Sequence, residues 1–294
     1  MQQFTIKPLV IAIIVAGVLL GGAYLLFGLD PSNDQVAQSH RSYELEITSD
    51  TKNIKPGQPV KISYKVKNDL GDVLKDFETV HEKIMHFILA RKDLQQFQHL
   101  HPEYNQATGE FSVNVTFPTD GPYRLFPDFT PGKNAENSQL LPVTLTQDVN
   151  VGNLSNYKAV PISADAASNK NVDGYNIIYS IEGELQAQMP ASYTLSIEKN
   201  GKKVTNLEPY LGAMGHSVIL KAETLDFIHA HAESASAGSS NITFSTTFPE
   251  PGLYKTFTQF QHQGRVLTSE YVFSVSEMSG DMPMGEDGME NMNH

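Results

Sequence analysis

Six histidines occur in two groups of identical spacing, and neutral imidazole is a common protein ligand for zinc and copper. The groups are His86, His99 and His101, then His216, His229 and His231. Two residues spaced i, i+2 on a β-strand share one face, and a hairpin can bring a third opposite them at roughly 5 Å between Cβ atoms. Each group therefore predicts a three-imidazole metal site. A slip of one residue would turn the single histidine to the other face, so the prediction depends on the register.

The elements that must position these side chains are two predicted hairpins. In the first, residues 84–89 are apolar, Arg91-Lys92-Asp93 suits a turn, and a second strand carries Phe97 and the histidine pair. The second hairpin covers residues 213–231, with its turn near residues 222–224. By parity the histidine face also carries Phe97 and its counterpart Phe227, so we expect each site at the edge of a core.

The hairpin belongs to an internal repeat. With an offset of 130, residues 68–103 align with residues 198–233 without a gap, and all three histidines are retained. The identical pairs are Gly71/Gly201, Glu78/Glu208, His86/His216, Phe97/Phe227, His99/His229, His101/His231 and Glu103/Glu233. A repeat of this length indicates two copies of one domain rather than a solenoid.

Further side chains are candidates to complete or orient the sites. Glu103 and Glu233 follow each histidine pair with the same parity, Asp128 has Gln259 as its counterpart, and His262 and Met214 fall near the second group. Met85 precedes His86, so it points to the opposite face, and we expect it in the core. The alternative for all of these residues is structural: histidines that hydrogen-bond to the backbone and pack on phenylalanine.

The C-terminal segment, residues 277–294, is rich in methionine and acidic residues. Its candidate ligands are Met278, Met282, Met284, Met289, Met292 and His294. Thioether sulfur is soft and favours Cu(I), and the spacing of Met282 and Met284 lets two sulfurs reach one ion. Gly, Asp, Glu and Asn separate the methionines, so we expect a disordered tail. The alternative is an acidic tail in which methionine is incidental.

Composition narrows the chemistry. The 294 residues include no cysteine, which excludes disulfides and thiolate metal sites. The formal net charge of −12 argues against nucleic acid and anionic membrane surfaces as partners and favours the collection of cations.

An uncharged stretch at residues 8–28 is long enough to cross a bilayer as a helix. We interpret residues 1–29 as an uncleaved transmembrane signal anchor, with a cleaved signal peptide as the alternative. Lys7 precedes the stretch while Asp30 and Asp34 follow it, which places the N-terminus in the cytoplasm and the rest outside. The predicted location is therefore the cytoplasmic (inner) membrane, with the bulk of the chain on the periplasmic side.

The remaining pattern predicts an all-β fold. Short alternating runs separated by turn residues occur at 43–48, 60–66, 111–117, 123–129 and 141–151 and recur in the second half. We expect a tether at 30–41, a first sandwich at 42–154, a linker at 155–173, and a second sandwich at 174–276. Both are predicted to be immunoglobulin-like antiparallel β-sandwiches.

The residues IMHFILARKDLQQFQHLHPE and GPYRLFPDF, with YLGAMGHSVILKAETLDFIHAH and GLYKTFTQFQHQG in the second copy, resemble the bacterial YtkA-like/FixH-like group. The resemblance covers about half of the chain and implies an anchored, immunoglobulin-like protein that handles copper or other heavy metals outside the cytoplasm. The second copy departs from the first at Ala232, where the first has Pro102, and at Gln259, where the first has Asp128.

Together these features predict an extracytoplasmic, membrane-anchored protein that sequesters or delivers copper, as Cu(I) or Cu(II), with zinc as the other candidate ion. Each sandwich would hold one ion, and a membrane metal transporter or oxidase would be the partner. A non-metal protein-interaction module is the alternative. We do not expect an enzyme: a cupin-like metal site would need another histidine some tens of residues after His101, and the next one is His216.

Overall fold

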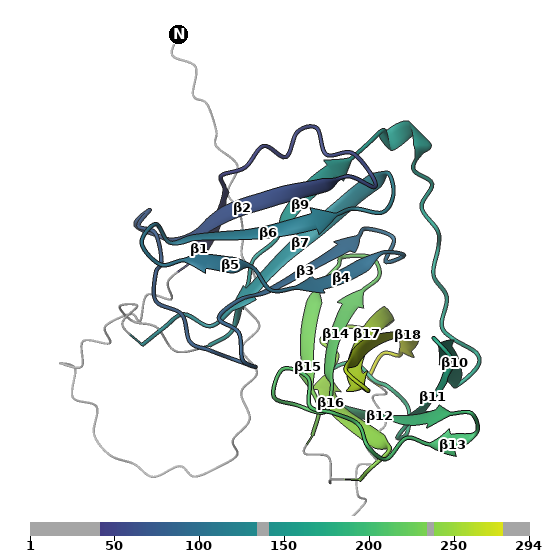
Figure 1. Ribbon diagram of the computed structural model, residues 1–294. Coiled ribbons are helices and arrows are strands. Elements are labelled where there is room, and N and C mark those ends of the chain that lie inside the picture. Colours follow the sequence, from purple (N-terminus) through teal and green to yellow (C-terminus); the bar gives the residue numbers. More distant parts are fainter. Residues whose placement is uncertain (1–41, 134–140, 234–237, 279–294) are drawn as a thin grey trace, which may run out of the picture. The chain divides into compact units, whose positions relative to one another are not determined.

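The computed structural model describes residues 42–133, 141–233 and 238–278 (Figure 1). These residues form an all-β fold of antiparallel sheets with one short 3-10 helix, η1 (Leu154–Asn156). Among them no helix is long and apolar enough to span a bilayer, and the predicted anchor lies outside the described ranges. The sheets divide into two lobes, defined here as residues 42–156 and 169–278, which belong to one compact unit.

The first lobe contains two sheets. Its strands are β1 (Tyr43–Ile47), β2 (Pro59–Asn68), β3 (His86–Arg91), β4 (Phe97–Leu100), β5 (Glu103–Asn105), β6 (Glu110–Thr116), β7 (Gly121–Phe129), β8 (Val143–Thr144) and β9 (Gln147–Val151). One sheet has the order β1-β2-β6-β5, and the other has the order β4-β3-β7-β8 with β9 also paired to β7. Their facing side chains form one buried cluster, so the two sheets pack as a β-sandwich-like pair.

The second lobe repeats this arrangement. Its strands are β10 (Asn169–Val172), β11 (Tyr175–Ile181), β12 (Pro190–Lys199), β13 (Lys202–Lys203), β14 (His216–Lys221), β15 (Phe227–His231), β16 (Asn241–Thr247), β17 (Gly252–His262) and β18 (Arg265–Val275). One sheet has the order β10-β11-β12-β13 with β16 also on β12, and the other has the order β15-β14-β17-β18. A separate buried cluster lies between these sheets.

Alternation along the strands explains the cores. In β2, Ile62, Tyr64 and Val66 point inward and are fully buried. The Tyr64 ring stacks between Phe87 and Phe111, with ring centres 5.4 and 5.5 Å away. Aromatic pairs from the two sheets therefore fill the space between the layers.

The two central strands β3 and β14 lack this alternation, because both of their faces are buried. Phe87 and Leu89 enter the core of the first lobe, whereas Ile88 and Ala90 join a third cluster with residues of the second lobe. The alternate residues of β14 behave in the same way, with Val218 and Leu220 in that third cluster. The even-numbered face of each central strand thus forms the contact between the lobes.

In each lobe, a tyrosine near the start of β7 or β17 hydrogen-bonds to the turn before that strand. The Tyr123 hydroxyl donates to the carbonyl of Thr119 at 3.1 Å, and the Tyr254 hydroxyl donates to the carbonyl of Glu250 at 2.8 Å. The two bonds occupy equivalent places in the repeat.

Most predicted strands are found, with two differences. Residues 169–172 fall in the predicted linker but form β10, which pairs with β11. The predicted strand at 141–151 is divided into β8 and β9. Asn200 and Gly201, a residue pair typical of hairpin turns, both have positive φ, 52° and 70°, between the paired strands β12 and β13.

Candidate metal centre at the lobe interface

The histidines of the first lobe form a compact group. His86 begins β3, His99 lies on β4, and His101 follows β4. The pairing of Ile88 with His99 gives the register that the sequence predicts and places His99 and His101 on the face of the sheet that also carries His86 and Ile88. One ring nitrogen from each histidine lies within 4.8 Å of the corresponding atoms of the other two. Three imidazoles can therefore reach one ion.

Hydrogen bonds to fixed acceptors decide which nitrogens carry hydrogen. His86 Nε2 lies 3.1 Å from the Val80 carbonyl, which only accepts, so this nitrogen must donate. His99 Nδ1 lies 2.8 Å from Oε1 of Gln259 and donates to it when the amide nitrogen of Gln259 is directed to Thr268 Oγ1, as in this structure. In the neutral rings, His86 Nδ1 and His99 Nε2 therefore each carry a lone pair.

These two lone-pair nitrogens face each other at 3.0 Å. Neither can donate to the other in this pair of neutral tautomers. Burial, with the neighbouring His99, lowers the pKa of His86 to about 4, and burial lowers that of His99 to about 4 despite its bond to Gln259. A shared proton is thus disfavoured at neutral pH, and a metal ion is a cation that could satisfy both atoms.

His101 supplies the third ring of the group. Its ring centre lies 5.2 Å from that of His86 and 4.9 Å from that of His99. Its buried Nε2 has no hydrogen-bond partner among the described residues. Burial, with His86 and Lys83 nearby, lowers the pKa of His101 to about 4, so this ring too is neutral at pH 7. A neutral imidazole with a buried unbonded nitrogen matches the state in which histidine binds metals.

The second lobe presents a related group. His216 pairs with His231 across β14 and β15, and Val218 pairs with His229, so the backbone register repeats that of the first lobe. His216 Nε2 donates to the Tyr210 carbonyl at 2.8 Å. The side chain of His231 lies outside what the structure describes.

The two groups meet across the contact between the lobes. His229 Nδ1 of the second lobe bonds to Asp128 Oδ2 of the first at 3.1 Å, while His99 of the first lobe bonds to Gln259 of the second. Asp128 and Gln259 occupy equivalent repeat positions, as do the two histidines. The ring centres of His86 and His229 lie 5.8 Å apart. The first group still consists only of first-lobe histidines, and each lobe also accepts a hydrogen bond from a histidine of the other.

Reciprocal contacts also form the apolar floor beneath the histidines. Phe97 stacks on Phe257 with ring centres 4.2 Å apart, and the equivalent pair, Phe227 with Phe126, lies at 5.6 Å. All eight fully enclosed members of the third cluster are apolar. The water-poor surroundings strengthen electrostatic interactions at the histidines above them.

Polar contacts at the other end of the interface are also reciprocal, with each lobe donating a hydrogen bond to the other. Lys255 Nζ donates to the Leu94 carbonyl at 2.7 Å, and its counterpart Arg124 donates to the Thr224 carbonyl at 3.0 Å. Leu94 and Thr224 are also equivalent in the repeat. The contact between the lobes is thus approximately two-fold symmetric.

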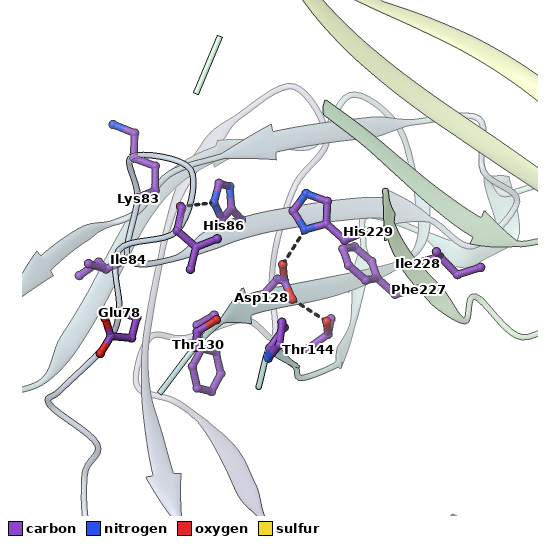
Figure 2. Close-up of a pocket in the computed structure, with 13 residues that line it drawn as sticks. Glu78, Lys83, Ile84, His86, Asp128, Thr130, Thr144, Phe227, Ile228 and His229 are labelled. Carbon is purple, nitrogen blue, oxygen red and sulfur yellow. Dashed lines mark hydrogen bonds and ion pairs between the residues drawn. The ribbon is translucent and has the colours of Figure 1, made fainter. Parts of the chain in front are cut away.

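A cavity of about 340 Å³ opens beside the histidines. His86, Asp128 and the second-lobe residues Phe227 and His229 line part of it. Figure 2 shows Asp128 between His229 and Thr144, both of which hydrogen-bond to it. Of the His86, His99 and His101 group, only His86 lines this cavity.

Sequence reasoning missed His81, which lies at the same interface. Its ring centre is 4.8 Å from that of His216 and 6.3 Å from that of His86. The counterpart of His81 in the second copy is Leu211, so comparison of the two copies did not identify His81 as a candidate. Its nearness to His86 in the sequence was the available signal.

The remaining candidates are distributed as follows. Glu103 lies on β5, in the sheet opposite the histidines, and is exposed, so the structure contradicts its place in the site. Glu233 bonds to Ser245 through its carboxylate, and His262 is buried between Tyr175 and Asn206. Neither belongs to the described histidine group.

The methionines also separate. Met85 is buried in the first core, which confirms its predicted position. Met214 is half-buried just before β14, and Met278 is exposed. Met282, Met284, Met289, Met292 and His294 lie outside the described residues.

Comparisons with known proteins add a family but no activity. A family model described as "Domain of unknown function (DUF8832)" matches residues 38–148 and 170–277. No curated protein matches. Solved structures with similarity include Escherichia coli alpha-2-macroglobulin activated by porcine elastase, with 11% identity and a TM-score of 0.25 over 81% of this chain and 20% of that one. Domains 5-6 of the S-layer protein SbsC match with 11% identity and a TM-score of 0.23 over 82% of this chain and 100% of that one.

Proposed function

We propose that this chain, which belongs to the family described as "Domain of unknown function (DUF8832)", binds a metal ion. His86, His99 and His101 are the proposed ligands. Copper is the proposed ion and zinc the alternative, since imidazole suits both.

The observation that carries this proposal is the 3.0 Å contact between two lone-pair nitrogens, His86 Nδ1 and His99 Nε2. With metal–nitrogen bonds of about 2.0–2.1 Å, nitrogens 3.0 Å apart subtend about 91–97° at the ion. An angle near 90° is typical of tetragonal Cu(II), and tetrahedral Zn(II) would need the nitrogens at about 3.3 Å. The contact is therefore compatible with copper, and a shift of about 0.3 Å would accommodate zinc.

The interactions around the ligands support a built site. Val80 and Gln259 fix the orientation of His86 and His99 by accepting their N–H groups, which is how proteins usually hold metal-binding histidines. A merely structural pair of histidines would gain from one ring donating to the other, and these acceptors prevent it.

The strand order supports an immunoglobulin-like assignment for both lobes. The first lobe has β1-β2-β6-β5 facing β4-β3-β7-β9, which corresponds to the ABED and CFG sheets of that fold with one added strand. Tyr123 and Tyr254, bonded back to the preceding turns, occupy the place of its tyrosine corner.

We further propose that residues 8–28 anchor the protein in the cytoplasmic membrane and that both lobes lie outside the cytoplasm. The methionine-rich segment after Met278 would capture Cu(I) and pass it to, or receive it from, a membrane transporter or oxidase. The absence of cysteine and the abundance of thioether sulfur in the sequence support this division of roles. The proposed role is binding and delivery rather than catalysis.

The test is a titration of the detergent-purified full-length chain with Cu(II) and Zn(II) by equilibrium dialysis at pH 7. The His99→Ala/His101→Ala variant should bind one Cu(II) fewer per chain than the wild type. Gln98→Ala, which alters the residue directly before His99, is the matched control and should bind as the wild type does, because the Gln98 side chain bonds to the Thr116 carbonyl. Equal Cu(II) binding by all three proteins would refute the proposal.

A further inference from the structure

The cavity beside the histidines lies where the two lobes meet, and most of its wall is apolar. The first lobe contributes Ile84, Phe129 and Pro142 to this wall. The edge strand β15 of the second lobe contributes Phe227 and Ile228. The volume of about 340 Å³ falls at the lower end of the range for small-molecule sites, roughly 300–1,000 Å³, and such sites favour boundaries between domains. The size and the walls therefore suit a small ligand with an apolar body.

Asp128 is the buried charged group of this cavity. The residue is 6% exposed, and its carboxylate bonds to Thr144 at 2.6 Å and to His229 at 3.1 Å. An ionised carboxylate offers about four lone-pair positions, so these two partners do not fill it. Within the described ranges no lysine or arginine forms an ion pair with it. A buried carboxylate without a fixed cationic side chain is costly, which favours a ligand that supplies the positive charge.

The other charged residues of the cavity do not cancel this charge. Glu78, which is half-buried, adds a second carboxylate and accepts a hydrogen bond from the backbone N–H of Lys133 at 3.3 Å. Lys83 is the only lysine or arginine among the described lining residues, and Figure 2 shows its ammonium group directed away from Asp128. Two carboxylates against one ammonium leave the lining net negative, so it favours a cation over an anion.

The second copy of the repeat lacks this pair of carboxylates. Gln259 stands in the place of Asp128. Glu208, the counterpart of Glu78, is already bonded by the side-chain amide of Gln261 at 2.9 Å. The negative lining is therefore specific to the first lobe, and we expect one such site per chain.

We propose that this cavity binds a small organic ammonium ion with an apolar body, of the arylalkylamine class. The ammonium group donates hydrogen bonds to the Asp128 carboxylate, and the body lies between Phe129 of the first lobe and Phe227 of the second. This function goes beyond metal binding. It uses neither His99 nor His101, so it does not depend on the proposed copper site.

The experiment compares probes that share one body and differ in the head group: 4-phenylbutylammonium, 4-phenylbutanol and 4-phenylbutanoate. Calorimetric titrations use the metal-free, detergent-purified full-length chain, with the detergent alone as the blank. At pH 8 an ordinary imidazole is neutral and an alkylamine is protonated. The ammonium probe should bind about 10–100-fold more tightly than the alcohol, the range for a hydrogen bond to a charged group. The carboxylate probe should bind more weakly than the alcohol.

Asp128→Asn tests the anchor, because asparagine keeps the size of the side chain and an oxygen to which Thr144 can donate. The variant should bind the ammonium probe about as weakly as the alcohol. Its affinity for the alcohol, which reports an intact cavity, should stay within about twofold of that of the wild type. Asp50→Asn removes an exposed negative charge of the first lobe outside the cavity, so it is the matched control and should bind as the wild type does.

A wild type that binds none of the probes, or binds the alcohol or the carboxylate at least as tightly as the ammonium, overturns the proposal. A preference for the ammonium probe that persists in Asp128→Asn also overturns it. If Asp128→Asn loses the alcohol as well, the order of the probes in the wild type decides. The His99→Ala/His101→Ala variant should bind the ammonium probe as the wild type does, whatever its copper binding, so failure of the copper site and failure of this cavity are distinguishable.

Discussion

Gln259 provides the sharpest test of the first site, because it lies in the second lobe yet fixes a ligand of the first. Its Oε1 accepts the N–H of His99, and its own amide is held by Thr268. Replacing it with leucine in Gln259→Leu removes this acceptor while keeping a buried side chain of similar size. His99 can then carry its hydrogen on Nε2 and donate to His86, so an ion must displace a hydrogen bond in order to bind.

Loss of an outer hydrogen bond to a metal-binding histidine typically weakens metal affinity by about 10–100-fold, or about 1.4–2.7 kcal/mol. We expect that increase in the Cu(II) dissociation constant of the His86 site. A competition titration of the full-length wild type and of Gln259→Leu against a chromophoric chelator at pH 7 measures it.

Gln261→Leu is the matched control. This residue lies two positions along the same strand, and its amide bonds to Glu208 instead of a histidine. The affinity of the Gln261→Leu variant for Cu(II) should stay within about twofold of that of the wild type. An unchanged dissociation constant in Gln259→Leu, or an equal loss in Gln261→Leu, would show that Gln259 does not orient a metal ligand.

Three other predictions concern stability. Burial lowers the pKa of His86 and His99 to about 4, so between about pH 6.5 and 4 the unfolded chain binds protons that the folded apo chain does not. The apo unfolding free energy should therefore fall by about 1.4 kcal/mol per pH unit for each ring below pH 6.5 and be independent of them above it. Urea unfolding at pH 7.0, 6.0 and 5.0 checks this slope, and an identical slope in a His86→Asn/His99→Asn variant would contradict it. Phe257→Ala removes a fully buried ring stacked on Phe97 and should cost about 3–5 kcal/mol by urea unfolding, whereas Leu70→Ala, at a side chain that is 69% exposed, should change stability by less than about 0.5 kcal/mol. Free Cu(II) at about 100 times its dissociation constant should add about 2.7 kcal/mol, or about 5–11 °C in melting temperature, and a chelator should reverse the gain.

Local pattern was sufficient for much of the fold. Alternation in β2, the turn at Asn200-Gly201 and the parity of the histidine pairs each depend on a few neighbouring residues, so the sequence predicts them directly. Asn169–Val172, which forms β10, was predicted to belong to a linker because residues 155–173 are rich in alanine, serine and asparagine. Pairing with β11 stabilises this strand, and such tertiary support overrides weak strand propensity.

The contact between the lobes was not predictable from the same reasoning. Buried residues occupy both faces of β3, so its pattern cannot show whether the second face meets its own core or another domain. His81 was hidden because self-comparison retains only what both copies share. The roles of Asp128 and Gln259 require knowledge that each of them crosses to the other lobe.

The contact between the lobes explains why certain residues are identical in the two copies of the repeat. An approximately two-fold interface uses the same residue twice, once in each lobe, so a substitution in one copy disturbs a contact with an equivalent residue of the other. The retained Phe97 stacks on Phe257 across the interface, and the retained Phe227 packs on Phe126. The retained histidines lie on the same face. Asp128 and Gln259 are where the symmetry is broken: a carboxylate bonds to His229, whereas a neutral amide bonds to His99, so the two halves of the contact differ in charge.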